Sequence, residues 1–121
     1  MSEERHITKR KSFEFAVRVV RLARYLQIEK NEFVLSKQIL RSGTSIGANI
    51  EEASAGQSRG DFRSKMSIAS KEARETMYWL RLLKETDFLE KKLADSLIHD
   101  CNELVSLLTS IVKTTAQRCE A

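Results

Sequence analysis

Apolar residues recur at helical spacing in four segments of this chain. The third segment is the clearest, because its apolar side chains fall within about 60° of one line when each residue turns a helix by 100°. These residues are Phe62, Met66, Ala69, Ala73, Met77, Leu80 and Leu83. The four predicted helices span residues 12–26, 33–53, 59–85 and 88–113. Short links join them, so the pattern predicts an all-α, antiparallel up-down-up-down four-helix bundle.

Capping residues indicate where the helices begin. Ser12 is the predicted N-cap of the first helix, and Ser58, with Asp61 three residues later, opens the third. Asp87, followed by Glu90, is the predicted cap of the fourth. The bundle domain is therefore predicted over residues 12–113, between a basic flexible tail at residues 1–11 and a frayed end at residues 114–121.

The second and third helices carry features beyond a single core stripe. Gly43 and Gly47 each cost about 1 kcal/mol relative to alanine inside a helix, which is tolerable where a neighbouring backbone must approach closely. A loop at these glycines is the alternative. On the third helix Ile68, Trp79 and Leu82 form a second apolar stripe away from the core stripe. Burial of that stripe between subunits predicts a homo-oligomer.

Composition agrees with a helical protein. The 121 residues include no proline and only four glycines, with 41% hydrophobic and 31% charged residues. No apolar run approaches the roughly 18–20 residues that cross a bilayer, and the first residues lack the apolar core of a secretory signal. We therefore expect a cytoplasmic protein without a membrane contact.

The net charge of +4 is concentrated near the N-terminus. Residues 1–24 hold seven basic and three acidic side chains. The basic strip predicted to contact phosphate consists of Lys9, Arg10, Lys11, Arg18 and Arg21. A solvated helix face is the alternative for a monomer. A ring of five copies would carry about +20, which suits a polyanion such as RNA. The chain has no run of aromatic residues for base stacking, so sequence-specific recognition is not expected.

Polar residues share one flank of the second helix and face a similar flank of the third. Arg41, Asn49 and Glu52 lie on the second helix, with Glu72 and Glu75 on the third. We interpret them as a structural polar network in which the arginine neutralises carboxylates. Two weaker alternatives are partner binding and acid–base catalysis by Arg41, Glu52 and Glu75. No nucleophilic histidine or cysteine joins the set, so no catalytic residue is predicted.

The cysteines and histidines do not suggest a metal site or a disulfide. Cys101 and Cys119 are 18 residues apart on one predicted helix, which is about 27 Å. That separation excludes a bridge within one chain. Cys101 is expected in the core and Cys119 as a free thiol. His99 points to a different side from Cys101, so neither a metal nor a cofactor is predicted.

The residues from the second helix to the end of the third resemble the bacterial family of ribosomal-RNA intervening-sequence proteins. The matching residues are Gln38, Arg41, Ser42, Gly43, Ser45, Ile46, Asn49, Ile50, Glu52, Ser58, Asp61, Phe62, Ile68, Ala69, Glu72, Glu75, Trp79, Leu80 and Leu83. Ala53 departs from the glycine of many relatives. The resemblance spans about residues 13–112 and implies a four-helix bundle assembled as a ring-like homopentamer. A distantly related family of pentameric bundles accompanies retroelement reverse transcriptases. Neither family implies a catalytic activity.

The sequence therefore predicts a non-enzymatic, pentameric four-helix bundle whose basic first helix binds nucleic acid, with RNA as the first candidate. The alternative function is a protein-binding scaffold or accessory factor that makes no direct contact with nucleic acid. Salt-sensitive RNA binding would distinguish the first function from the second.

Overall fold

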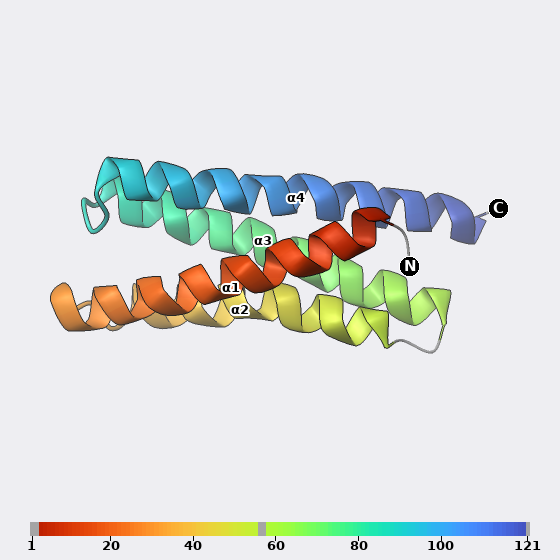
Figure 1. Cartoon of the computed structure of the whole chain (residues 1–121), viewed down its shortest axis with the longest axis horizontal. Coiled ribbons are helices and arrows are strands. Elements are labelled where there is room, and N and C mark those ends of the chain that lie inside the picture. The colour runs from red at the N-terminus through yellow and green to blue at the C-terminus, as the bar shows by residue number, and fades with distance from the viewer. Residues whose placement is uncertain (1–2, 56–57, 121) are drawn as a thin grey trace.

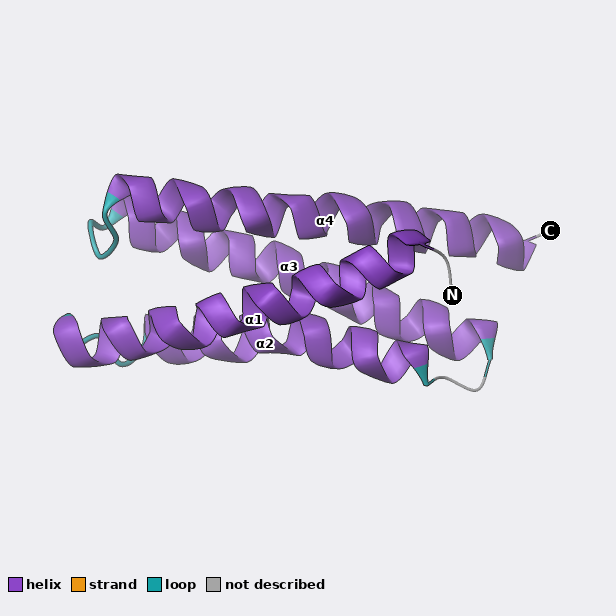
Figure 2. Cartoon of the chain, in the orientation of Figure 1, coloured by secondary structure: helices purple, strands orange, loops and turns teal. Residues whose placement is uncertain are grey.

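Four α-helices make up the part of the chain that this computed structural model describes, residues 3–55 and 58–120, and that part holds no strand. They are α1 (Glu3–Glu29), α2 (Leu35–Ser54), α3 (Arg59–Glu85) and α4 (Lys91–Glu120). Successive helices run in opposite directions, and α1 also packs against α4 (Figure 1). Figure 2 shows that the connection between α3 and α4 is short relative to the helices. The prediction of an all-α fold with four helices is confirmed.

All four helices contribute apolar side chains to one core. On α3 the buried side chains follow the stripe predicted from the sequence, with Leu80 and Leu83 fully inaccessible to solvent. Cys101 of α4 is buried as expected, and its thiol donates to the carbonyl oxygen of Ala73 on α3 at 3.3 Å. Burial raises the pKa of this thiol to about 12, and the negative charge of Asp100 adds to the shift. Cys101 is therefore a protonated core residue rather than a nucleophile.

Gly43 lies inside α2 and allows α1 to approach closely. A Cβ atom built at Gly43 would lie 2.7 Å from Cγ1 of Val19 and 2.8 Å from Cγ2, which is much too short for two carbon atoms. At Gly47 the nearest atom to such a Cβ is Oγ of Ser12, at 3.4 Å. The helix is continuous through both glycines, so the loop alternative is excluded. Close approach requires a glycine at Gly43, where the neighbour is a side chain of α1, whereas the distances at Gly47 are ordinary contacts.

The start of α1 differs from the prediction. The helix begins at Glu3, so the flexible tail expected over residues 1–11 is wrong for residues 3–11, while residues 1–2 lie outside the described part. Ser12 is not an N-cap but a buried residue within the helix, where its hydroxyl donates to the carbonyl oxygen of Lys9 at 2.8 Å. Tertiary contacts explain the extension. Thr8 is fully buried, and the Arg5 guanidinium lies 4.1 Å from the centre of the Phe62 ring on α3.

The caps of the later helices fall partly where they were expected. Ser58 caps α3 and accepts a hydrogen bond from the backbone N–H of Asp61 at 3.1 Å, which confirms the predicted start. Asp87 does not cap α4. It lies in the preceding turn with a φ of 62°, and the helix begins at Lys91. The backbone carbonyl of Glu90 accepts the first helical hydrogen bond there, from the N–H of Ala94 at 2.9 Å. The helix then continues past the predicted fraying point, to Glu120.

The start of α2 depends on Glu32, which precedes the helix predicted over residues 33–53. The carboxylate of Glu32 accepts hydrogen bonds from three backbone N–H groups, those of Val34 at 3.2 Å, Leu35 at 3.0 Å and Ser36 at 2.7 Å. Burial raises the pKa of Glu32, but these hydrogen bonds outweigh burial and hold the pKa below its ordinary value of 4.5. The negative charge also suits the positive end of the helix dipole.

Candidate functional site

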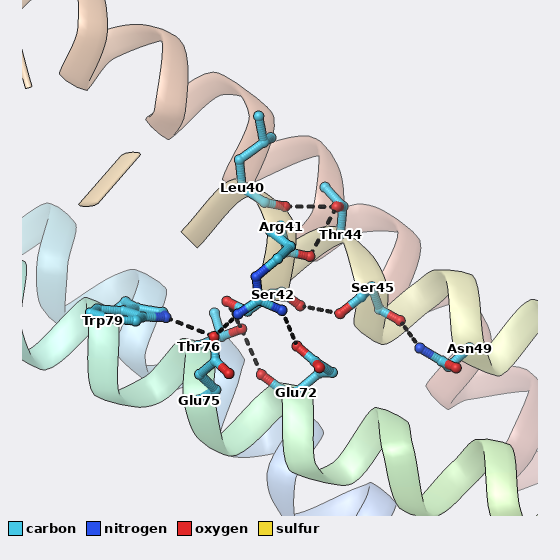
Figure 3. A network of polar contacts seen from close by, with 10 residues as sticks. All are labelled: Leu40, Arg41, Ser42, Thr44, Ser45, Asn49, Glu72, Glu75, Thr76 and Trp79. Atoms are coloured by element: carbon cyan, nitrogen blue, oxygen red, sulfur yellow. Dashed lines mark hydrogen bonds and ion pairs between the residues drawn. The ribbon is translucent and has the colours of Figure 1, made fainter. Parts of the chain in front are cut away.

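An arginine of α2 joins two carboxylates of α3 on the outer surface of the bundle (Figure 3). Arg41 donates through Nη1 to Oε2 of Glu72 at 3.2 Å and through Nη2 to Oε2 of Glu75. The same Glu75 oxygen accepts a hydrogen bond from the indole N–H of Trp79 at 3.0 Å. Glu75 therefore contacts both the arginine and the tryptophan, and the ion pairs of Arg41 join α2 to α3 at this point.

A buried pair of hydroxyls lies beneath this network. Thr76 Oγ1 contacts Ser42 Oγ at 2.9 Å across the boundary between α2 and α3, and both side chains are fully inaccessible to solvent. Thr76 also donates to the carbonyl oxygen of Glu72 at 2.7 Å. The polar contacts thus continue from the surface into the core, which fixes the position of α2 along α3.

Two residues predicted for the network lie elsewhere. Glu52 pairs with Lys65 of α3 at 2.9 Å, more than two helical turns from Arg41. Asn49 donates to the carbonyl oxygen of Ser45 in its own helix at 2.8 Å (Figure 3). The structure therefore brings together Arg41, Glu72 and Glu75 but not Asn49 or Glu52. These two residues lie on the same side of α2 as Arg41, but they are two or more turns away along the helix.

The second apolar stripe of α3 is partly exposed in the single chain. Ile68 keeps 39% of its surface accessible, whereas Trp79 and Leu82 are half-buried. Tyr78, which is not part of the stripe predicted from the sequence, is 56% exposed, and its ring meets that of Trp79 edge to face at 5.1 Å between centroids. Because Tyr78 directly precedes Trp79 in the sequence, its neighbourhood to the stripe could have been predicted. These four residues form what we call the α3 outer stripe.

The basic strip of α1 lies next to acidic residues of α4. Lys11 pairs with Glu103 at 3.0 Å. Arg18 pairs with Asp100 at 2.6 Å and also donates to the hydroxyl of Ser96 at 3.2 Å. These contacts join the first helix to the last, so part of the positive charge of α1 holds the bundle together.

The other members of the strip are mostly paired as well. Lys9 lies 3.4 Å from a carboxylate oxygen of Glu51 on α2, and Arg10 lies 3.5 Å from that of Glu14 on its own helix. Arg21 is the one member of the five whose charge faces no carboxylate within ion-pair distance among the described residues. Adjacent carboxylates repel phosphate, so the local field of α1 is much weaker than its composition suggests.

The described residues contain no obvious site for a metal or for a membrane. No group of three or more histidine, cysteine, aspartate or glutamate side chains is placed to hold an ion there. None of the helices in this part combines the length and the apolar character that crossing a bilayer requires. Cys119 falls among the side chains outside the described set.

The fold defines a helical-bundle protein whose four helices pack around one apolar core. The chain belongs to the 23S rRNA-intervening sequence protein family, whose model matches residues 4–110. It is similar to a protein of unknown function from the S23 ribosomal protein family of Bacteroides thetaiotaomicron, with 54% identity and a TM-score of 0.89. That similarity covers 91% of this chain and 98% of the other. No match was found among the curated proteins. The family resemblance deduced from the sequence is confirmed.

Proposed function

We propose that this protein is a non-enzymatic homo-oligomer, most simply a pentamer, that binds nucleic acid, with RNA as the first candidate. The observation that carries the assembly is the α3 outer stripe. An exposed tyrosine, an exposed isoleucine and a half-buried tryptophan lie together on one side of one helix. Aromatic residues are enriched in the buried centres of subunit interfaces.

The polar network prepares this stripe for a partner. The hydrogen bond from the Trp79 indole to Glu75 fixes the ring, and the ion pair of Glu75 with Arg41 fixes the carboxylate. A side chain that is already held in place loses less conformational entropy when a partner covers it. The network therefore favours a subunit contact at the boundary of α2 and α3 over a catalytic use of the same carboxylates.

Assembly would also strengthen binding to a polyanion. One chain carries a net charge of +4, and a pentamer would carry about +20. A ring presents the same basic surface repeatedly, so weak phosphate contacts at several subunits act together. The strip of Lys9, Arg10, Lys11, Arg18 and Arg21 is the surface predicted from the sequence. Its ion pairs reduce what it can contribute.

The assembly is tested by the mass of the purified protein in solution. We expect light scattering to give several times the 13.9 kDa of one chain. Trp79→Ala should shift that mass toward the monomer while helix content stays close to the wild type. Phe13→Ala is the matched control, since Phe13 is 68% exposed but lies on α1. A monomeric wild type at micromolar concentration, or equal dissociation by both variants, would contradict assembly through this stripe.

The alternative function is a scaffold whose repeated sites bind another protein without nucleic acid. The α3 outer stripe supports this alternative too, because an apolar surface of this kind fits a protein better than a phosphate backbone. The two functions are distinguished by measuring the binding of labelled RNA at low and high salt. Binding that weakens steeply with salt supports nucleic acid, whereas no binding at low salt leaves the scaffold as the function.

A further inference from the structure

The boundary between α3 and α4 carries a row of basic side chains that have no acidic partner among the described residues. Arg63, Arg74 and Arg81 are exposed and lie 11 and 7 residues apart on α3. Because 11 and 7 residues are close to whole numbers of helical turns, the three side chains share one side of the helix. The row extends for about 27 Å at 1.5 Å per residue.

One contact shows which way this row faces. Arg74 donates through Nη2 to the hydroxyl of Thr109 on α4 at 3.0 Å, so the row follows the seam between the two helices. Lys113 is exposed and lies one turn beyond Thr109 on α4, and therefore borders the same seam. We call Arg63, Arg74, Arg81 and Lys113 the α3–α4 seam.

The seam keeps its positive charge. Among the described side chains, no carboxylate lies within ion-pair distance of any of its four members, and the partner of Arg74 is a neutral hydroxyl. Two acidic residues lie near the α3–α4 turn, beyond the end of the seam. Asp95 pairs with Lys84 at 2.7 Å, and Glu85 is exposed. The strip of α1 differs, since most of its cations are matched by carboxylates.

We infer that the α3–α4 seam is the surface that binds the phosphate backbone of a nucleic-acid duplex. This inference rests on the nucleic-acid binding proposed above. A planar guanidinium matches two phosphate oxygens at once, and three of the four seam cations are arginines. The hydroxyl groups of Ser70 and Thr109 lie beside them and belong to the side-chain types that contact phosphate.

The shape of the seam favours a duplex over a single strand. Its straight length of about 27 Å corresponds to the rise of about eight base pairs. Single-stranded nucleic acid is usually held on several stacked aromatic rings. Tyr78 is the one exposed aromatic residue of α3, so the seam lacks such a platform in the described part of that helix. Contacts to the backbone alone carry no sequence information.

The seam is compatible with the proposed assembly. At 100° per residue, Ile68 lies about 140° around α3 from Arg63, and Trp79 about 160° from Arg81. Trp79 faces the α2 side, where it shares Glu75 with Arg41, whereas Tyr78 and Leu82 of the outer stripe line a surface hollow together with Arg81 of the seam. A subunit contact centred on Ile68 and Trp79 therefore leaves the seam open and repeats it around the oligomer.

The inference is tested with two charge-matched triple variants of the full chain. The seam variant is Arg63→Gln/Arg74→Gln/Arg81→Gln, and the strip variant is Lys11→Gln/Arg18→Gln/Arg21→Gln. Both lose three positive charges. Binding of one labelled RNA duplex and one DNA duplex is measured by fluorescence anisotropy over a range of salt concentrations. Circular dichroism and light scattering establish that each variant is folded and assembled like the wild type.

For the seam variant we expect the slope of log affinity against log salt on DNA to fall by about 2.7. Affinity at low salt should fall on the order of 100-fold or more. The strip variant should change the slope by less than about one. A third variant, with lysine at the same three seam positions, should keep the wild-type slope, which separates lost charge from damage to the fold.

Each other outcome overturns the inference in a different way. If the wild type binds neither duplex at low salt, nucleic-acid binding itself fails and the seam has no role in it. If the wild type binds and only the strip variant loses affinity, the proposed function stands but the site is on α1. If both triple variants lose affinity equally, net charge alone decides binding and no local site exists.

Discussion

Replacing Arg41 with alanine tests whether the network between α2 and α3 is structural and whether another subunit covers it. The Arg41 side chain is 52% exposed in the single chain, while its partners Glu72 and Glu75 are 21% and 37% exposed. Partly exposed ion pairs contribute about 0.2–1 kcal/mol each. Two such pairs predict that Arg41→Ala lowers the free energy of unfolding of an isolated chain by about 0.5–2 kcal/mol.

Coverage by a second subunit would change that magnitude. Removing one partner from a fully buried ion pair costs about 3–5 kcal/mol, because a carboxylate is left without solvent or a partner. We therefore expect Arg41→Ala to cost more in the assembled protein than in the monomer, and to make the oligomer dissociate at a higher protein concentration.

The measurement is urea unfolding followed by circular dichroism at two widely separated protein concentrations. Arg24→Ala is the control, since Arg24 is an exposed residue of α1 and a substitution there should change stability by about 0.5 kcal/mol at most. A double-mutant cycle with Glu75→Gln gives the coupling between the two side chains. The reasoning is refuted if Arg41→Ala leaves both the unfolding midpoint and the oligomer mass unchanged.

Two further predictions concern stability. Gly43→Ala should destabilise the protein by about 1–3 kcal/mol in thermal unfolding, because the added Cβ would overlap a side chain of α1. Gly47→Ala should be neutral or stabilising by up to about 1 kcal/mol. Equal effects of the two variants would contradict the close approach at Gly43. Glu32→Ala should cost about 1 kcal/mol at pH 7. The pKa of Glu32 is lower in the folded state than in the unfolded chain. The loss of unfolding free energy should therefore be constant at pH values above the ordinary pKa of 4.5, and it should disappear as the pH falls through the lower pKa of the folded state. A loss that does not depend on pH would show that the charge of Glu32 has no role.

The sequence predicted the elements well wherever a local signal decided them. The serine cap of α3 places its start at Arg59 as expected, and the period of apolar residues identifies the buried side of that helix. Local signals failed at the ends that tertiary contacts control. Ser12 resembles a cap, but packing of Thr8 extends α1 by about two and a half further turns toward the N-terminus. Asp87 resembles a cap as well, yet it adopts the left-handed conformation of a turn.

The candidate polar network was predictable only in part. Helical spacing places Glu72, Glu75 and Trp79 on one side of α3, and Arg41 on the adjoining side of α2. The same spacing could not exclude Glu52, because angular position around a helix contains no information about which residue of the neighbouring helix lies opposite. That register depends on the close approach at Gly43 and on the buried hydroxyl pair, which are contacts between helices.

The basic strip of α1 shows why charge counted along a sequence differs from charge presented on a surface. Lys11 and Arg18 lie far along the chain from Glu103 and Asp100, but the fold places each pair in contact. The excess positive charge of the N-terminal segment is thereby reduced by acidic residues of the last helix. The basic residues of α3 are spread through a segment of mixed charge, so they do not stand out in the sequence. Packing places Arg74 against Thr109 of α4, and among the described side chains no carboxylate lies within ion-pair distance of Arg63, Arg74 or Arg81. A positive surface in a helical bundle is therefore a property of helix pairs rather than of one helix, and at the α3–α4 seam the described side chains place no carboxylate within ion-pair distance of the cations.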